Sequence, residues 1–162
     1  MCVKLITEIE DEEIIENFDC EEDSINEFLK DYAKEYNKNG EGITYVVLDE
    51  ELNKIVGYYT IKCNAIQTEE TNGDKIVHPA VEITRLGVDK NYKKKGNGSL
   101  CLGHAINQIN ELKSIVGIKM VFLYSLPEAE GFYYKFGLRY LSSSYNQLEC
   151  EDSCCTPMYT II

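Results

Sequence analysis

Residues 80–116 contain an apolar strand pattern, a glycine turn and a helical pattern in direct succession, and this order constrains the fold most. The strand pattern covers residues 80–88, three lysines with Gly96 and Gly98 follow, and residues 98–116 have helical periodicity. A helix that begins directly after a glycine turn presents backbone N–H groups without partners. The helix dipole and the lysines add positive charge at the same place. The sequence therefore predicts an anion site between the strand and the helix, suited to the phosphates of a cofactor.

Two familiar phosphate-loop motifs do not describe this turn. The nucleoside triphosphate motif Gly-x-x-x-x-Gly-Lys-Ser/Thr is absent, and Cys101 occupies the third glycine position of Gly-x-Gly-x-x-Gly. A strand, a glycine turn and a helix are also common scaffolding, and lysine runs are often simply solvated. The turn alone therefore leaves a binding site and a plain scaffold both open.

Length and composition indicate a single folded domain covering residues 1–162. The chain is 44% hydrophobic and 27% charged, which is typical of a globular protein. No apolar run approaches the roughly 20 residues that a membrane helix needs. Acidic sequence follows residues 1–4, so we expect no secretory signal, no membrane association and a cytoplasmic location.

The formal net charge of −12 argues against general nucleic-acid binding, which depends on neutralising phosphates with lysine and arginine. An acidic surface attracts amines, polyamines or basic peptides instead. The lysines at 93–95 stand out against this background, so a local basic patch stays possible.

Seven cysteines are many for this length, but their spacing is irregular and contains no Cys-x-x-Cys. With only two histidines in addition, we expect no metal site. Reduced thiols are the expected state. Cys63 and Cys101 are expected to be structural, because free cysteines are often buried. Cys150, Cys154 and Cys155 form a candidate redox-sensitive group.

The remaining periodicities predict a mixed α/β domain without internal repeats. Ser24 and Glu27 have the spacing of a capping box, and residues 67–78 are expected to form a loop that borders a substrate site. His78 is expected at the surface and His104 at the core boundary. The expected strands cover residues 3–10, 44–48, 55–66, 80–88, 118–126, 138–141 and 157–162, and the expected helices cover 25–37, 98–116 and a short stretch from 127 to 136.

Four segments follow one another in the chain: residues 57–59 (GYY), 86–92 (LGVDKNY), 93–98 (KKKGNG) and 132–138 (FYYKFGL). Together they resemble the GNAT superfamily of acetyl-CoA-dependent N-acetyltransferases, in which the second segment is usually Leu-x-Val-Asp-x-x-Tyr and the third Gln/Arg-x-x-Gly-x-Gly/Ala. Lys93 departs from the usual Gln or Arg, and Asn97 from a commonly apolar residue. The resemblance implies a GNAT-like fold with a central mixed or antiparallel sheet flanked by helices. It also implies direct transfer of an acetyl group from acetyl-CoA to a primary amine of a small molecule or peptide.

The resemblance further implies where the cofactor binds. The thioester and pantetheine would lie against the end of the central strand, and the pyrophosphate would lie on the amides of the glycine turn, near the lysines. The residues so implied are Leu86, Gly87, Val88, Lys93, Lys94, Lys95, Gly96, Asn97, Gly98 and Ser99.

Two residues are candidates for acid–base catalysis. The resemblance places Tyr133 at the position of the family's general acid. A phenol with a pKa of about 10 is neutral at pH 7 and can protonate a thiolate. An aromatic core role and the neighbouring Tyr134 are the alternatives. Glu82 matches the strand position at which some members have a general base. A water chain, or Glu128 and Glu130, could replace it.

Two alternative functions stay open. Residues 18–20 (FDC), with Leu29 and Ala33, are similar to a GNAT subgroup of toxins that acetylate aminoacyl-tRNA, although the net charge of −12 disfavours RNA. The other alternative is a catalytically silent module that binds CoA. A homodimer is the expectation from the family resemblance.

Overall fold

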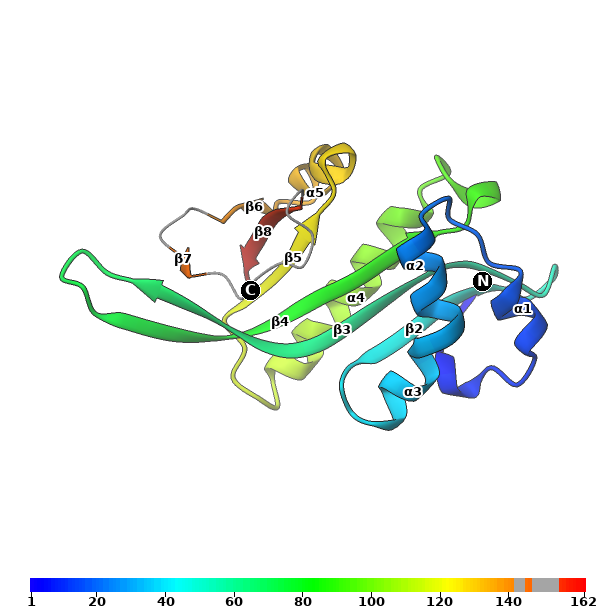
Figure 1. The fold of residues 1–162 in the computed structure, drawn as a ribbon, viewed down its shortest axis with the longest axis horizontal. Helices are drawn as coiled ribbons and strands as arrows, with labels where there is room; N and C mark the ends of the chain where they lie inside the picture. Colours follow the sequence, from blue (N-terminus) through cyan, green and yellow to red (C-terminus); the bar gives the residue numbers. More distant parts are fainter. Residues whose placement is uncertain (142–144, 147–154) are drawn as a thin grey trace. The chain divides into compact units, whose positions relative to one another are not determined.

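The computed structural model describes residues 1–141, 145–146 and 155–162 (Figure 1). These residues form two compact units. The first unit comprises residues 1–62 and 84–107, and the second comprises residues 63–83 and 108–162. Two long strands, β3 (Lys54–Glu69) and β4 (Lys75–Val88), contribute residues to both units. Within the described residues, no helix combines the length and apolarity that a membrane span requires.

The first unit contains a sheet with the strand order β1-β2-β3-β4. Strand β1 (Cys2–Leu5) pairs antiparallel with β2 (Ile43–Asp49), which pairs antiparallel with β3, so that Val46 lies opposite Tyr58. The helical segments of this unit are η1 (Ile6–Glu8), α1 (Glu12–Glu16), α2 (Asp23–Glu27), η2 (Phe28–Tyr32), α3 (Ala33–Lys38), η3 (Lys90–Tyr92) and the first turns of α4 (Asn97–Lys113).

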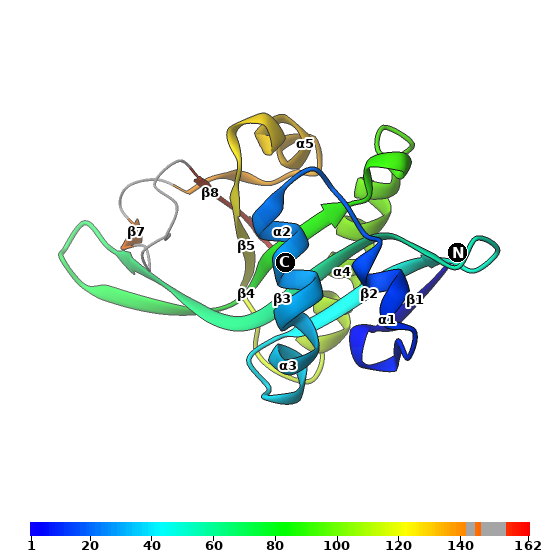
Figure 2. The ribbon, with the colours of Figure 1, turned by 45° about the vertical axis from the view of Figure 1, so that its right-hand side comes forward.

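Helices cover both faces of this sheet. Figures 1 and 2 show α2 and α3 in front of β2 and β3, with α4 behind them. The close contacts agree, because Gly87 of β4 packs against Ile25 of α2, whereas Gly57 of β3 packs against Cys101 of α4. One cluster of buried side chains fills the space under α1, α2 and η2: Ile6, Ile9, Ile14, Ile15, Phe18, Cys20, Leu29, Ala33, Val46, Leu48, Ile55 and Tyr58.

The helix predicted over residues 25–37 is observed as α2, the single π-helical turn η2 and α3. The predicted capping box is wrong. The carbonyl of Glu22 already accepts hydrogen bonds from the backbone N–H groups of Ile25 (3.1 Å) and Asn26 (2.9 Å). Ser24 therefore lies inside the first turn, where its side chain cannot cap the helix.

The second unit has parallel and antiparallel strand pairs, as the predicted mixed sheet requires. Strand β5 (Met120–Ser125) is parallel to β4, with Glu82 opposite Phe122, and nearly all of it is buried. Strand β8 (Thr156–Ile161) runs antiparallel to both β5 and β6 (Arg139–Tyr140). The remaining elements are η4 (Pro127–Ala129), α5 (Glu130–Lys135) and β7 (Tyr145–Asn146), which pairs with β3.

The loop expected over residues 67–78 is wrong, because most of these residues extend β3 and β4 into a long hairpin. Only residues 70–74 turn, with Gly73 at a φ of 84°. The Thr68 hydroxyl of β3 lies 2.9 Å from His78 Nε2 of β4, and His78 Nδ1 lies 2.9 Å from Nζ of Lys119, the residue before β5. The pairing of the two strands satisfies backbone groups that a loop would leave to water.

Helix α4 starts at Asn97, close to the start at residue 98 that the periodicity predicts, and its first three turns bury one apolar face. Leu102, Ala105 and Ile109 are buried, whereas Leu112 is exposed and Val116 lies beyond the helix end at Lys113.

Candidate active site

The end of β4 leads through η3 and a turn at residues 93–96 into α4, as the sequence predicted. Lys94 and Gly96 have positive φ angles of 61° and 84°. A Cβ at Gly96 would meet no atom within 4 Å, so the turn is open on that side. The first intrahelical bond runs from the Leu100 N–H to the Gly96 carbonyl at 3.0 Å. The amides of residues 97–99 therefore have no intrahelical acceptor and are suited to an anion.

Side-chain hydrogen bonds stabilise the turn at residues 93–96. Asn97 is 7% exposed, and its Nδ2 donates to the Tyr92 carbonyl at 2.9 Å. Lys95 Nζ donates to the Asn91 carbonyl at 2.9 Å and lies 5.7 Å from the centre of the Tyr92 ring. The Tyr92 hydroxyl donates to Asp49 at 3.0 Å. The departure at Asn97 thus has a structural reason, since its amide fixes the turn.

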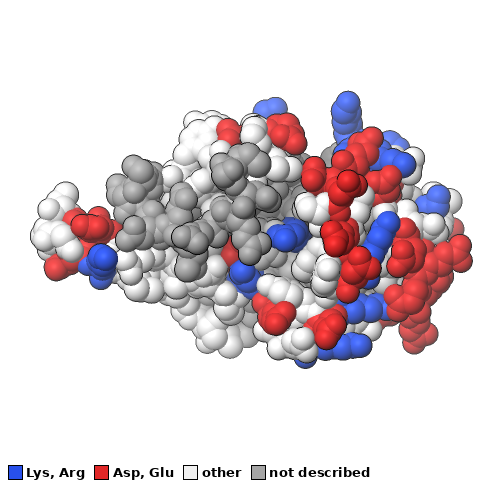
Figure 3. Space-filling model, in the orientation of Figure 1, with Lys and Arg blue, Asp and Glu red and all other residues white. Residues whose placement is uncertain are grey.

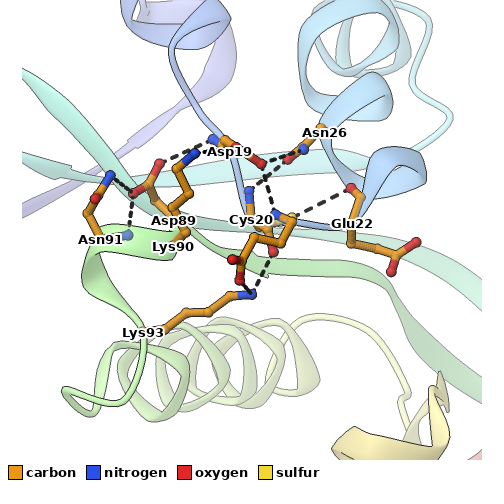
Figure 4. A network of polar contacts seen from close by, with 9 residues as sticks. Asp19, Cys20, Glu22, Asn26, Asp89, Lys90, Asn91 and Lys93 are labelled. Carbon is orange, nitrogen blue, oxygen red and sulfur yellow. Dashed lines mark hydrogen bonds and ion pairs between the residues drawn. The ribbon is translucent and has the colours of Figure 1, made fainter.

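The lysines of the turn are not equivalent. Lys93 Nζ donates to the Cys20 carbonyl at 2.7 Å and forms an ion pair with Glu21 at 2.8 Å (Figure 4). Lys94 is exposed and has no ion pair or hydrogen bond with any residue that the structure describes. The charge at the position of the family's Gln or Arg therefore binds the N-terminal segment, whereas Lys94 is available to a ligand.

Asp19 connects this N-terminal segment to the residues after β4 (Figure 4). Its carboxylate accepts hydrogen bonds from the Glu21 N–H at 2.9 Å and from Asn26 Nδ2 at 3.0 Å. Lys90 Nζ lies 2.8 Å from the other oxygen. The hydrogen bond from Lys90, followed by those from Glu21 and Asn26, holds the pKa of Asp19 well below its usual range.

Asp89 also joins the N-terminal segment to the residues after β4, and it is buried, with 5% of its surface exposed. Its carboxylate accepts from the backbone N–H groups of Asp19 (3.1 Å) and Asn91 (2.9 Å) and from Asn91 Nδ2 (3.0 Å). The Lys90 N–H donates to the Asp19 carbonyl at 2.8 Å. Residues 19–21 and 89–93 therefore form one polar network. Sequence reasoning missed this network, although an Asp followed two residues later by Asn is a turn signal.

At the end of β4, side chains of neighbouring elements pack directly against the backbone of Gly87. A Cβ at Gly87 would lie 2.7 Å from Ile25 Cγ2 and 3.2 Å from Tyr58 Cε1. A Cβ at Gly57 would lie 2.8 Å from the Gly87 carbonyl oxygen and 2.9 Å from Cys101 Sγ. Glycine is required at both positions because two backbones and two helices approach closely there.

The cysteines divide by burial. Cys101 is buried, as expected of a structural cysteine, and burial raises the pKa of its thiol to about 12. The same expectation is wrong for Cys63, which is exposed on β3. Cys155 is half-buried, and Cys150 and Cys154 lie outside the described residues. The described part of the chain has no cluster of three or more side chains suited to a metal ion.

Glu82 lies in the second unit, on β4, and is 8% exposed. Asn64 Nδ2 donates to its Oε2 at 2.7 Å. A buried carboxylate held by an amide donor has a defined position, which a general base needs. Glu130, one of the fallback bases, accepts hydrogen bonds from the hydroxyls of Thr156 and Tyr140.

Tyr133 also lies in the second unit, on α5, and is 9% exposed. Burial raises the pKa of its phenol to about 12. Its competitor Tyr134 is 49% exposed, and the Arg139 guanidinium lies 4.4 Å from the centre of its ring. The two neighbouring tyrosines therefore differ sharply in environment.

A surface pocket of about 480 Å³ lies beside this network in the first unit, but its lining does not suit phosphates. Three acidic residues, Asp11, Glu13 and Asp89, line it against one basic residue, Lys54. Because like charges repel, the open turn at residues 93–99 is the better anion site.

Comparison with known proteins identifies the family. The family model "Acetyltransferase (GNAT) domain" matches residues 40–139. The chain is 24% identical over 136 residues to a "tRNA-acetylating toxin" of Mycobacterium tuberculosis (strain ATCC 25618 / H37Rv), an alignment that covers 79% of this chain and 80% of that protein.

Solved structures have the same fold. AtaT complexed with acetyl-methionyl-tRNAfMet has a TM-score of 0.79 at 20% identity and covers 99% of this chain and 94% of its own. AtaTR bound with acetyl-CoA has a TM-score of 0.73 at 22% identity and covers 99% of this chain and 92% of its own. Since the family model matches more than half of the chain, the protein belongs to the GNAT family and is an acetyl-CoA-dependent acetyltransferase.

Proposed function

We propose that this enzyme transfers the acetyl group of acetyl-CoA to the α-amino group of an aminoacyl-tRNA. One observation carries the proposal: a structure that shares the fold over 99% of this chain is that of AtaT with acetyl-methionyl-tRNAfMet. The similarity to a "tRNA-acetylating toxin" adds support. This acceptor replaces the small-molecule or peptide amine that the sequence analysis favoured.

The net charge of −12 does not oppose this proposal as strongly as it first suggests. A net charge is a sum over the chain, and Figure 3 shows acidic side chains in several groups, one of them over α1, with lysine and arginine side chains between them. Asp11, Glu12, Glu13 and Glu16 are adjacent there. An acceptor that inserts only the 3′ end of its RNA needs a few local cations and no wholly basic surface.

The reaction joins the acceptor nitrogen to the thioester carbonyl carbon and breaks the carbon–sulfur bond. The neutral amine attacks, and the proton that it loses must be accepted. In our proposal Glu82, held by Asn64, accepts that proton directly or through water. Backbone N–H groups at residues 86–88 polarise the carbonyl oxygen.

Tyr133 donates the proton that the departing CoA thiolate needs. Because burial raises the pKa of this tyrosine to about 12, the phenol is protonated at neutral pH. In each turnover Glu82 thus takes one proton from the acceptor amine, and Tyr133 gives one proton to the CoA thiolate.

Acetyl-CoA would bind through the turn after β4. We propose that its pyrophosphate accepts hydrogen bonds from the amides of residues 97–99, with Lys94 as the adjacent free cation. Lys93 does not bind the pyrophosphate in this proposal, because its ammonium group is already paired with Glu21 and stabilises the turn. This division explains how lysine is accommodated where the family usually has Gln or Arg.

A set of matched acceptors tests the proposal. Methionyl-tRNA, methionine methyl ester and spermidine would each be mixed with enzyme and acetyl-CoA, and the release of the CoA thiol measured. We expect methionyl-tRNA to have the highest kcat/KM, although the ester has the same α-amine. A higher kcat/KM for spermidine would indicate a small-amine acetyltransferase. CoA binding without thiol release from any acceptor would indicate a silent module.

A further inference from the structure

Arg85, on β4 two residues before Gly87, has a charge that no described acidic residue neutralises. Its Nη1 donates to the Thr84 carbonyl at 2.8 Å. Its Nε is shielded from solvent and has no acceptor among the described residues. Buried polar groups in proteins are nearly always hydrogen-bonded, and an unsatisfied charged group is the costlier exception. This arginine therefore calls for a partner from outside the described structure.

The surroundings of Arg85 explain why its charge stays uncompensated. The Phe28 ring lies 5.2 Å from its Cζ, so the guanidinium packs against an aromatic face. Because side chains alternate along a strand, Arg85 projects to the same side as Gly87, which contacts Ile25 of α2. The side chain is half-buried, and water screens it only in part.

Three other cations of the first unit have acidic partners, whereas Lys94 has none but is exposed to solvent. Lys34, Lys90 and Lys93 each form an ion pair, with Glu12, Asp19 and Glu21 respectively. The sequence has 28 acidic residues against 16 Lys and Arg, so acidic partners are abundant. A half-buried arginine that still has none among the described residues is therefore a specific feature, which points to an anionic ligand.

We propose that Arg85 binds a phosphodiester at the 3′ end of the acceptor tRNA. The inference rests on the proposed function. In an aminoacyl-tRNA the reactive amine belongs to an amino acid esterified to the last ribose, and the nearest anion is the phosphodiester of that same nucleotide. Arg85 directly precedes residues 86–88, and a strand advances about 3.3 Å per residue. It is thus one to three residues from the proposed thioester site.

The geometry of the guanidinium suits a phosphodiester. Nη1 donates to the Thr84 carbonyl and the Phe28 ring packs against the guanidinium, so Nε is the atom that lacks an acceptor among the described residues. The Nε–Nη2 edge is a planar fork that matches two oxygens of a phosphate. Because Nε is shielded in this structure, our proposal requires the side chain to rotate when the phosphate binds.

The substitution Arg85→Gln tests this inference, with methionyl-tRNA and methionine methyl ester as acceptors. We expect kcat/KM for methionyl-tRNA to fall about tenfold to a hundredfold, as for a lost charge-assisted hydrogen bond. The kcat/KM for methionine methyl ester should change less than about twofold. The Kd of CoA should not change. Arg85→Lys should recover only part of the loss, because an ammonium lacks the fork.

Arg139→Gln is the matched control. Arg139 also stacks on an aromatic ring, that of Tyr134, but its Nη1 donates to the carbonyls of Tyr134 and Leu138. This variant should leave both acceptors unaffected. An equal fall with both acceptors in Arg85→Gln, an increased Kd of CoA, or no fall at all would overturn the inference.

A binding measurement separates this inference from the proposed function. Fluorescence anisotropy would follow a short labelled RNA ending in CCA, without an amino acid, on the CoA-loaded enzyme. Binding that Arg85→Gln abolishes, together with no transfer to methionyl-tRNA, would uphold the inference and reject the function. Acetyl transfer to methionyl-tRNA that is unchanged in Arg85→Gln would uphold the proposed function and reject the inference. A wild-type enzyme that neither binds this RNA nor uses methionyl-tRNA would overturn both.

Discussion

Tyr133 illustrates how burial alone distinguishes two adjacent residues of the same type. Burial raises the pKa of Tyr133 to about 12, whereas Tyr134 is 49% exposed under the Arg139 guanidinium. The alignment of residues 132–138 with the family motif favoured Tyr133 over Tyr134. The structure shows in addition that the Tyr133 phenol is buried and protonated at neutral pH. Sequence could not supply that difference, since it depends on what packs around α5.

Replacing this phenol should separate chemistry from binding. Tyr133→Phe should lower kcat about a hundredfold to ten-thousandfold, the usual contribution of a positioned acid, and leave the Kd of CoA unchanged. Tyr134→Phe should have nearly wild-type kcat. Stopped-flow thiol release and calorimetry would measure the two quantities. A kcat for Tyr133→Phe within about threefold of wild type would show that another group protonates the thiolate.

The pH dependence follows from the same pKa. An acid must be protonated to act, so activity should persist at alkaline pH until Tyr133 titrates at about 12. A tyrosine with the ordinary pKa of about 10 would lose activity two pH units earlier. The measurement is kcat at saturating acceptor between pH 7 and the alkaline limit of enzyme stability. A decline centred near pH 10 would contradict the assignment of the acid role to Tyr133.

Asp19 is a second residue whose environment determines its ionisation. Its pKa lies below the usual range, so the group stabilises the folded state above the unfolded pKa of about 3.9. This stabilisation is lost as pH falls from there towards the folded-state pKa. Asp19→Asn should therefore be less stable than wild type at pH 7, and the difference should shrink below about pH 4.

Urea unfolding from pH 7 to pH 2.5 would measure this difference. Asp31→Asn is the control, because the Asp31 side chain is exposed and has no hydrogen bond or ion pair with the described residues. Parallel curves for wild type and Asp19→Asn over the whole range would contradict the ionic role of Asp19.

Strand β4, the turn and α4 show what local sequence can predict. The strand, the glycine turn and the helix start at Asn97 all follow from patterns within about twenty residues. The network that fixes the turn does not, because Asp19 and Asp89 are 70 residues apart in the sequence. The hairpin at residues 67–78 was missed for a similar reason, since its strands are stabilised by each other.

The two lysines of the turn should respond differently to substitution. Lys94→Gln should raise the Kd of CoA about threefold, the scale of one exposed ion pair, and this effect should fade in high salt. Lys93→Gln should instead lower the free energy of unfolding by about 1 kcal/mol, through the lost Cys20 and Glu21 contacts. Calorimetry and urea unfolding would measure the two effects. A larger loss of CoA affinity in Lys93→Gln, with unchanged stability, would show that Lys93 binds phosphate directly.

At the scale of the whole molecule, composition was the least reliable guide to the acceptor. A net charge of −12 favoured a cationic amine, but it averages an acidic region around α1 with local cations such as Arg85 and Lys94. The motifs identified the fold, the cofactor and the reaction class from sequence. In our proposal the acceptor depends on side chains such as Arg85, and only the structure shows that its Nε has no acceptor among the described residues.

The most direct test is the chemical state of charged tRNA in cells that express the protein. Total tRNA would be isolated under acidic conditions and digested with nuclease, and the terminal aminoacyl-adenosines would be analysed by mass spectrometry. We predict N-acetylated aminoacyl-adenosine in cells with the wild-type enzyme and none in cells with Tyr133→Phe at equal expression. Unmodified aminoacyl-adenosines in both, alongside acetylated polyamines in the wild-type cells alone, would contradict the account.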